Sequence, residues 1–116
     1  MSGTDRDKWL MYGEFVTALD GRALAEYLRR CAFEAESGGW YVDAVDENGA
    51  RIAFVRARPQ LYRVTGTATT VTRMEESAVR LSEALQCAGI GHVLEVHATP
   101  DEVTAYAHPE WSDPEE

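Results

Sequence analysis

The chain is poor in the residues that carry most catalytic and metal chemistry. Its 116 residues include three histidines, two cysteines, four prolines and a single lysine, Lys8, beside ten arginines. It contains no glycine-rich phosphate loop, no Gly-x-Ser-x-Gly and no His-Glu-x-x-His motif. These absences remove the standard signatures of nucleotide-binding proteins, serine hydrolases and zinc proteases. We expect no cofactor and no metal, and we favour a function without catalysis.

The two cysteines, Cys31 and Cys87, stand at apolar positions of predicted helices. They lack Cys-x-x-Cys spacing and have no neighbouring histidine, so we interpret them as two buried free thiols rather than a disulfide or a metal pair. No run reaches the 18 apolar residues that a membrane span needs, and the first seven residues lack the basic start and apolar stretch of a signal peptide. The expected protein is soluble and cytoplasmic, and has no membrane partner.

Length and composition allow one domain. With 45% apolar content, 116 residues can bury one hydrophobic core without help from disulfides or metals. We predict a disordered N-terminus over residues 1–8, a single domain over 9–108 and an acidic tail over 109–116. Residues 1–9 are neutral and the tail carries −4, so the net charge of −9 leaves residues 10–109 only mildly acidic. Nucleic-acid binding is not expected, because it usually needs a net basic patch.

Positive charge is concentrated in one segment. Residues 48–74 carry five arginines and no acidic residue, whereas the whole chain carries −9. The other 89 residues therefore carry −14. This polarised distribution indicates where a charged partner would bind, since the field around a protein follows the placement of its charges.

Two segments have the periodicity of amphipathic helices. The first is predicted over residues 21–36, with Asp20 as its N-cap and Gly38-Gly39 as its stop. The second begins at Thr72, three residues before Glu75 as in a capping box, and ends before Gly89. We expect both apolar stripes to cover one face of a sheet. The stripes consist of Leu24, Leu28, Cys31 and Ala35, and of Met74, Ala78, Leu81, Leu85 and Ala88.

Three strands are predicted between the helices. Asn48-Gly49 is a strong signal for a two-residue turn between strands over residues 40–47 and 50–58, and a turn at 58–61 begins a third strand that runs to Thr67. In this register the core face carries Trp40, Val42, Ala44, Ala53, Val55, Ala57, Tyr62, Val64 and Gly66. The opposite face carries Tyr41, Asp43, Val45, Ile52, Phe54, Arg56, Arg58, Leu61 and Arg63.

A C-terminal hairpin is predicted from residues 92–98 and 103–108, joined through residues 99–102. The four joining residues, Thr-Pro-Asp-Glu, are also a good helix start, and residues 9–19 are predicted as a strand. The expected fold is α+β, an antiparallel sheet of about five to six strands with two helices packed on one face, in the order (β)-α-β-β-β-α-β-β. In the hairpin, the core face would carry Leu94, Val96, Ala98, Val103, Ala105 and Ala107, and the other face Val93, Glu95, His97, Thr104, Tyr106 and His108.

The element order over residues 21–108, together with the acidity of the chain, resembles the small secretion-chaperone type of fold. In that fold a helix, three strands, a helix and two strands make a dimeric, partner-binding unit. Acidic bacterial immunity proteins and phage-encoded inhibitors are similar in size and charge. The resemblance implies a protein-binding module of the inhibitor, immunity or chaperone-like type, which binds a protein partner or a second copy of itself.

The face of the predicted sheet away from the helices supplies the candidate site. Arg56 and Arg63 would lie side by side on neighbouring strands, which is unfavourable unless an acid or an anion lies between them. Arginine and aromatic side chains around an apolar centre are also typical of protein interfaces. We therefore predict an acidic protein partner, although the chain's own acidic residues would serve equally well. The candidate binding residues are Tyr41, Asp43, Phe54, Arg56, Arg58, Arg63, Glu95, His97 and Tyr106.

The alternative function is that of a small ligand-binding protein or enzyme. An anionic ligand could be held near Arg56, Arg63, His97 and Tyr106, or by the threonine-rich run of residues 65–72 at a helix N-terminus, with Arg63 and Arg73 on its flanks. Glu95 and His97 could act as acid and base with Tyr106 beside them. An ordinary polar strand edge and an ordinary helix cap have the same sequence, so protein binding is the function that the sequence favours.

Overall fold

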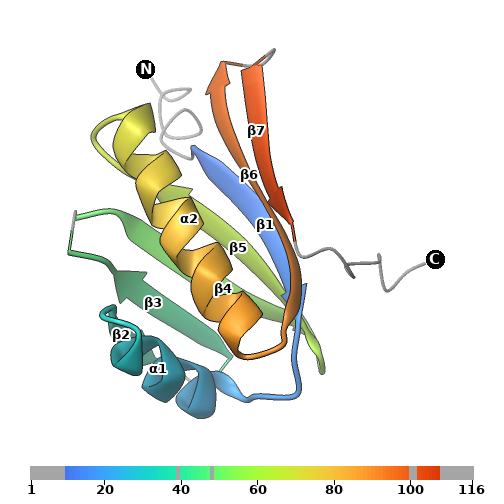
Figure 1. Cartoon of the computed structure of the whole chain (residues 1–116). Coiled ribbons are helices and arrows are strands. Elements are labelled where there is room, and N and C mark those ends of the chain that lie inside the picture. The colour runs from blue at the N-terminus through green and yellow to red at the C-terminus, as the bar shows by residue number, and fades with distance from the viewer. Residues whose placement is uncertain (1–9, 39, 48, 100–101, 108–116) are drawn as a thin grey trace, which may run out of the picture.

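The computed structural model describes residues 10–38, 40–47, 49–99 and 102–107 (Figure 1). The predicted N-terminal segment 1–8 and tail 109–116 lie outside the described residues. The seven described strands form one antiparallel sheet in the spatial order β2-β3-β4-β5-β1-β6-β7. The predicted α+β class is confirmed, although the sheet is larger than the five to six strands expected. The elements are β1 (Met11–Val16), α1 (Gly21–Arg30), β2 (Glu34–Ser37), β3 (Tyr41–Val45), β4 (Arg51–Arg58), β5 (Leu61–Thr67), α2 (Val71–Cys87), β6 (Gly91–Thr99) and β7 (Glu102–Ala107).

The helix α1 is shorter than its periodicity predicted. It begins as expected, because the Asp20 carboxylate accepts a hydrogen bond from the Ala23 N–H at 2.9 Å. It ends at Arg30, since Ala32 adopts a φ of 72° and the Phe33 N–H turns back to the Leu28 carbonyl. The residues that follow form the short edge strand β2. Ala35, predicted on the helix stripe, is therefore buried from a strand.

The helix α2 begins slightly earlier than predicted. The Thr70 hydroxyl, rather than that of Thr72, accepts from the Arg73 N–H at 3.1 Å and caps the helix. Gly89, with a φ of 71°, follows the last turn as expected. The apolar stripe is buried from its start through its last leucine, but Ala88 is exposed. Cys87 is exposed as well, so the prediction of two buried thiols is wrong for it, while Cys31 is half-buried.

Both helices lie on one face of the sheet (Figure 1). α1 packs against β2 and β3, whereas α2 packs against β6 and, to a lesser extent, β7. β1 lies between β5 and β6, so the first strand of the chain sits inside the sheet. Among the described residues, no helix has the length and apolarity that crossing a bilayer requires.

An aromatic cluster lies in the core between the sheet and the helices. Phe15 stacks on Tyr62 with ring centroids 5.2 Å apart, and it meets Phe54 edge-on at 5.7 Å. The Tyr62 hydroxyl donates to the Leu19 carbonyl at 2.9 Å, and burial raises the pKa of Tyr62. The helix leucines that cover this core are fully buried, as predicted: Leu24, Leu28, Leu81 and Leu85.

The strand β4 faces the opposite way from the prediction. The β3–β4 connection is one residue longer than a two-residue turn, because the Asp46 N–H bonds the Ala50 carbonyl and the Gly49 N–H returns to the Asp46 carbonyl. Gly49 has a φ of 83°, which glycine adopts without strain. Val45 therefore pairs with Arg51 and not with Ile52. Since successive side chains of a strand point to opposite faces, this shift turns the first part of β4 over.

Two further one-residue shifts occur within strands. In β4, Arg58 pairs with Leu61, as the predicted turn requires. The register shifts by one residue between Arg56 and Arg58, so that Arg56 pairs with Tyr62. In β6, the register changes between His97 and Thr99, so that Tyr106 pairs with Leu94. Residues 102–107 are a strand and not a helix, but the strand faces the opposite way from the prediction.

Side-chain burial follows these inversions. Ile52 and Phe54, expected opposite the core, are buried, whereas Trp40 and Val55, expected in the core, are 64% and 38% exposed. Leu61 is buried as well, against expectation. The other wrong core assignments are the exposed or half-buried Ala53, Ala57, Ala98, Val103 and Ala105. The correct core assignments are Val42, Ala44, Tyr62, Val64, Gly66, Leu94 and Val96.

The orientation of β4 can be tested with adjacent substitutions. Phe54→Ala should lower the free energy of unfolding by about 3–5 kcal/mol, because it removes a fully buried ring from the aromatic cluster. Val55→Ala should cost less than about 1 kcal/mol, because Val55 lies on the opposite face. Urea unfolding of both variants measures the difference. A larger loss of stability for Val55→Ala than for Phe54→Ala would instead support the two-residue turn.

Candidate functional site

The open face, meaning the side of the sheet away from both helices, is the largest surface that the fold leaves uncovered by secondary structure among the described residues. The strand registers place alternate residues of each strand on it. Its side chains come from all seven strands, so the face extends across the whole sheet. The residues are Tyr12, Glu14, Val16, Glu34, Glu36, Tyr41, Asp43, Val45, Arg51, Ala53, Val55, Arg58, Leu61, Arg63, Thr65, Thr67, Val93, Glu95, His97, Val103 and Ala105.

The structure divides the nine predicted binding residues among three places. Phe54 is in the core, and the prediction that it contacts a partner is wrong. Arg56 and Tyr106 pair with the core residues Tyr62 and Leu94, and so belong to the helix-covered face. Arg58, the last residue of β4, pairs with Leu61 and so lies at the end of the open face. The other residues that lie on the open face are Tyr41, Asp43, Arg63, Glu95 and His97.

The predicted pair of facing arginines does not form. Arg56 is directed away from the open face, and its Nε donates to the Pro59 carbonyl at 2.9 Å. Arg63 pairs across strands with Val55, and on its other side with Glu14. The Arg63 Nε lies 3.6 Å from a Glu14 carboxylate oxygen, an exposed ion pair of small energetic weight. Because no two arginines of the described strands face each other here, this face does not require an acidic partner between them.

The charge of the open face is negative. Among the residues on it, Arg51, Arg58 and Arg63 are the three arginines, and the five carboxylates outnumber them by two. Glu36 of β2 lies directly opposite Asp43 of β3, and like charges in such a pair destabilise a sheet. The five carboxylates are those of Glu14, Glu34, Glu36, Asp43 and Glu95.

The predicted acid–base group is only partly assembled. The Glu95 Oε1 lies 3.3 Å from the His97 Nε2, as two residues on one side of a strand should. Tyr106 is on the other face of the sheet, and Tyr12 instead meets the His97 ring edge-on at 5.2 Å. Tyr12 was missed because residues 9–19 are apolar in both alternating positions, which is expected for a strand inside a sheet.

The open face contains shallow hollows rather than one deep cleft. One of about 580 Å³ lies at the β2–β3 edge beside Glu34, Glu36 and Arg51, and one of about 350 Å³ lies over β1 between Tyr12, Glu14 and Glu95. A substrate pocket normally encloses its ligand with convergent polar groups. Within residues 10–38, 40–47, 49–99 and 102–107, no group of three His, Cys, Asp or Glu side chains could hold a metal ion.

The structure separates the parts of the anion site that the threonine-rich run could have formed. Thr70 uses its hydroxyl to cap α2, which is a structural role. Arg63 lies on the open face, whereas α2 covers the other face of the sheet. The run therefore ends as a strand followed by an ordinary helix cap.

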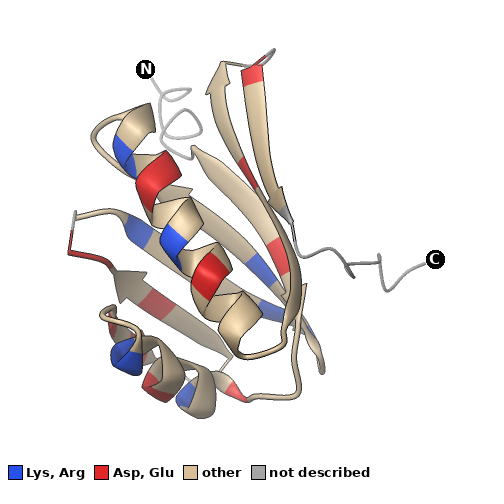
Figure 2. Cartoon of the chain, viewed as in Figure 1, with Lys and Arg blue, Asp and Glu red and all other residues tan. Residues whose placement is uncertain are grey.

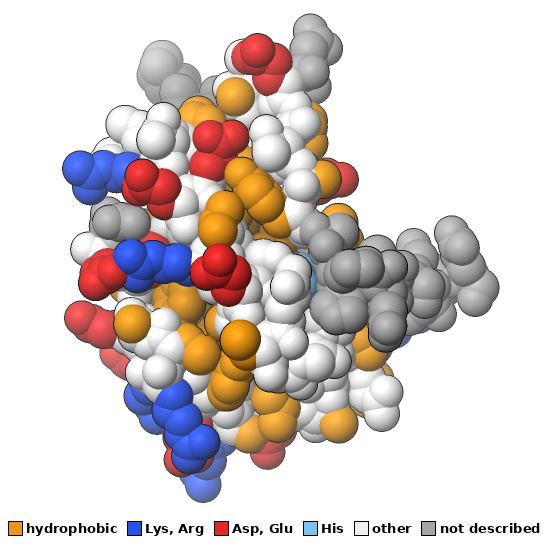
Figure 3. All heavy atoms as spheres, viewed as in Figure 1, with side chains coloured by type: hydrophobic (Ala, Val, Ile, Leu, Met, Phe, Trp, Pro, Cys, Tyr) orange, Lys and Arg blue, Asp and Glu red, His pale blue; other side chains and the backbone are white. Residues whose placement is uncertain are grey.

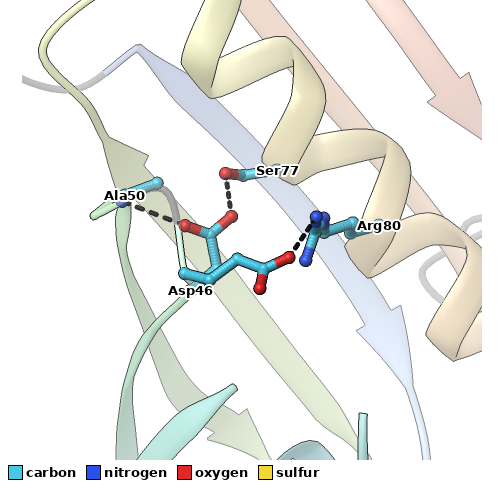
Figure 4. A network of polar contacts seen from close by, with 5 residues as sticks. Asp46, Ala50, Ser77 and Arg80 are labelled. Atoms are coloured by element: carbon cyan, nitrogen blue, oxygen red, sulfur yellow. Dashed lines mark hydrogen bonds and ion pairs between the residues drawn. The ribbon is translucent and has the colours of Figure 1, made fainter. Parts of the chain in front are cut away.

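Charges on the helix side are mixed. Arginines and acidic residues alternate along α2 (Figures 2 and 3). Arg80 of α2 forms an ion pair with Glu47 (Figure 4). Apolar side chains lie between them in the same view (Figure 3). The described residues of this side therefore carry both signs of charge along the helices.

A serine and a histidine form a buried pair beneath α2. The Ser82 Oγ lies 2.7 Å from the His92 Nε2, and the His92 Nδ1 lies 2.9 Å from the Ile90 carbonyl. A carbonyl can only accept, so Nδ1 donates to Ile90, and Nε2 accepts from the serine when the ring is neutral. Ser82 is 6% and His92 0% exposed, and neither lines the hollows of the open face. The pair resembles a catalytic dyad in bonding but has no access for a substrate.

A second buried polar group fastens the β3–β4 connection to α2 (Figure 4). The Asp46 Oδ1 accepts from the Ala50 N–H at 3.1 Å, and its Oδ2 accepts from the Ser77 hydroxyl. Asp46 is 4% and Ser77 0% exposed. Because the carboxylate is satisfied by a loop amide and a helix hydroxyl, its role is to hold the loop that sets the register of β4.

Asp46 and Glu47 offer a matched comparison of buried and exposed acids. Asp46→Ala should lower the free energy of unfolding by about 1–3 kcal/mol, because it leaves the Ala50 N–H and the Ser77 hydroxyl without this acceptor. Glu47→Ala should cost no more than about 1 kcal/mol, since its ion pair with Arg80 is exposed. Chemical denaturation of both variants tests this difference. Equal losses would show that the buried bonds contribute nothing beyond the surface pair.

The two helices are joined by a tyrosine. The Tyr27 hydroxyl of α1 donates to the Ala84 carbonyl of α2 at 2.6 Å. Burial, together with smaller contributions from the hydrogen-bonded Cys31 thiol and the charge of Cys87, raises the pKa of Tyr27 to about 12. Burial also raises the pKa of Tyr106, with a smaller contribution from Glu75.

The raised tyrosine pKa predicts a loss of stability in alkali. Above pH 10 the unfolded chain releases the Tyr27 proton while the folded protein retains it up to about pH 12, so the free energy of unfolding should fall as the pH rises through this window. Tyr27→Phe should have a shallower alkaline decline. Denaturant unfolding at several pH values from 9 to 12 measures both proteins. Identical alkaline declines for the two proteins would show that Tyr27 is not the group whose raised pKa lowers the stability.

Comparison with protein-family models, curated proteins and solved structures finds no match to the chain. The secretion-chaperone resemblance therefore remains one of element order. From α1 onward the observed order is α-β-β-β-β-α-β-β, which has the additional strand β2, and β1 joins the middle of the sheet. Function must be argued from the residues of the chain itself.

Proposed function

We propose that the protein is a small, non-enzymatic binding module of the inhibitor, immunity or chaperone-like type, which docks a partner protein on its open face. The observation that supports this proposal is the exposure of large apolar side chains there. Tyr12, Val55 and Val103 are 40%, 38% and 45% exposed, although they lie on a sheet face and not on loops. Charged and polar side chains of the neighbouring strands lie between them, and a mixture of exposed apolar and charged side chains is also found at protein interfaces.

The proposed partner is basic, in contrast to the expectation from the sequence. With Arg56 on the other face, carboxylates outnumber guanidiniums on the open face. The opposed Glu36 and Asp43 would gain most from a lysine or arginine placed between them, since that contact would remove their repulsion. Self-association through this face would bring two negative surfaces together, so we propose a different protein as the occupant.

The anionic-ligand alternative receives no support from the geometry. Of its four residues, Arg63 and His97 lie on the open face, whereas Arg56 and Tyr106 lie on the helix-covered face. A single small ligand cannot contact both faces of a sheet. Action in the cytoplasm remains part of the proposal, because Cys31 and Cys87 are both free thiols, as is usual in reducing compartments.

The open-face proposal can be tested with two valines of equal exposure. Val55→Lys places a cation on the open face and should abolish capture of the partner, because it adds repulsion to the lost apolar contact. Val79→Lys changes a side chain that is 39% exposed on α2, and it should capture the partner like the unmodified protein. Quantitative affinity purification from the native host compares the three proteins. Partner loss with Val79→Lys but not with Val55→Lys would place the interface on the helices.

Glu36 should show opposite effects on stability and on binding. Glu36→Lys replaces a like-charge pair with an attractive one, so it should raise the free energy of unfolding by about 0.2–1 kcal/mol. The same change should weaken binding to a basic partner and reduce the dependence of association on ionic strength. Thermal unfolding and salt-dependent binding measurements give the two results. Tighter partner binding by this variant would show that the partner is acidic.

A further inference from the structure

The most exposed of the large apolar side chains in the described residues lies away from the centre of the open face. Trp40, just before β3, is 64% exposed and packs edge-on against Tyr41 with centroids 5.3 Å apart. It lines a hollow of about 410 Å³ at the end of β4, which we name the Trp40 hollow. The residues that line the hollow are Trp40, Arg56, Ala57, Arg58 and Pro59.

The backbone explains why the tryptophan and the arginines meet. The Arg56 N–H donates to the Trp40 carbonyl at 3.0 Å, which places the two residues side by side on neighbouring chain segments. The register shift between Arg56 and Arg58 inserts Ala57 as an extra residue at this point. Trp40 is thereby placed beside two arginines at the end of the sheet instead of under the helices, where the sequence pattern predicted it.

The guanidinium of Arg56 is held in position. Its Nε and one terminal nitrogen both donate to the Pro59 carbonyl, so this side chain is fixed against the β4–β5 turn. A guanidinium has five N–H donors, and this arrangement leaves three for another acceptor. Because it is already ordered, it loses less conformational entropy on binding than a mobile arginine does.

The Trp40 hollow differs in charge from the rest of the protein. Among the described residues, its lining has two guanidiniums and no carboxylate, whereas the chain carries −9 and the open face carries more acids than bases. Tryptophan and arginine are also the side chains that contribute most often to binding hot spots, and arginine pairs with carboxylates through two parallel hydrogen bonds. The surface is complementary to an acidic chain segment that also offers apolar contact.

We propose that the Trp40 hollow binds an acidic peptide segment of a partner protein. Arg56 pairs with a carboxylate of that segment, Arg58 adds a second positive charge beside it, and the Trp40 ring covers the aliphatic part of its side chains. This inference does not depend on the open-face proposal, because it concerns other residues and a partner of opposite charge. The acidic residues of this chain's own segment 109–116, which lie outside the described residues, are the competing occupant.

The test uses the full-length, ¹⁵N-labelled protein and a capped hexaglutamate peptide as the probe. NMR signals of the Trp40 indole N–H and of the Arg56 and Arg58 Nε–H groups should shift saturably as the peptide is added. Arg58→Glu should weaken the peptide affinity by about tenfold or more, because it replaces an attraction by a repulsion. Trp40→Ala should also weaken it, and because Trp40 is largely exposed this variant should keep the folded spectrum. Arg51→Glu, a change of another exposed arginine on the open face, is the matched control and should bind normally.

Four outcomes would overturn the proposal. The first is an absence of shifts at millimolar peptide, and the second is equal binding by the well-folded Arg58→Glu and Arg51→Glu variants. The third is an equal response to inorganic phosphate, which would show an unselective anion site. The fourth concerns a full-length variant in which Glu110, Asp113, Glu115 and Glu116 are changed to their amides. If only that variant binds the peptide, the chain's own tail is the occupant.

Discussion

The alternation of side chains along β4 is the constraint on which the surfaces of this protein depend. A strand has a period of two, so a shift of one residue exchanges its faces completely. Here the shift is set by the β3–β4 connection, where Gly49 adopts a positive φ and Asp46 bonds both the Ala50 amide and the Ser77 hydroxyl of α2. As a result Phe54 joins the aromatic core and Val55 becomes exposed. The exchange therefore decides which side chains of β4 a partner could contact on the open face.

The exchange reverses the sign of the predicted interface. The arginines of residues 48–74 appear as one cluster in the sequence, but the fold distributes them over two faces and an end of the sheet. Arg63 lies on the open face beside Glu14, while Arg56 is fastened to Pro59 near Trp40. The open face is left with an excess of carboxylates, and the Trp40 hollow with an excess of guanidiniums. The positive segment is thus divided between the open face, where carboxylates of other strands outnumber its arginines, and the Trp40 hollow, where two of its arginines lie.

Burial separates the polar groups that stabilise the fold from those that are available to a partner. Ser82 with His92, and Asp46 with Ser77, are almost completely buried and satisfy each other, so they contribute to stability and specificity of packing. The opposed Glu36 and Asp43 are exposed and lower stability where they stand. A like-charge pair at a sheet edge is understandable if a basic partner neutralises it, which connects the sheet register to the proposed function.

The sequence by itself determined the α+β class, the buried leucines of both helices, the Asp20 cap, the core faces of β3, β5 and β6, and the strand character of β1. These features depend on local periodicity and capping, which a short stretch of chain expresses without its neighbours. The tertiary structure alone decided the faces of β4 and β7, the strand β2 and the exposure of Trp40. Each of these depends on a local feature: the positive φ of Gly49, the positive φ of Ala32, or a one-residue register shift within a strand. At each of these points the sequence is compatible with two local conformations. Packing against the helices and the neighbouring strands selects between them, because only one of the two buries Phe54 and Ile52 and leaves Val55 outside.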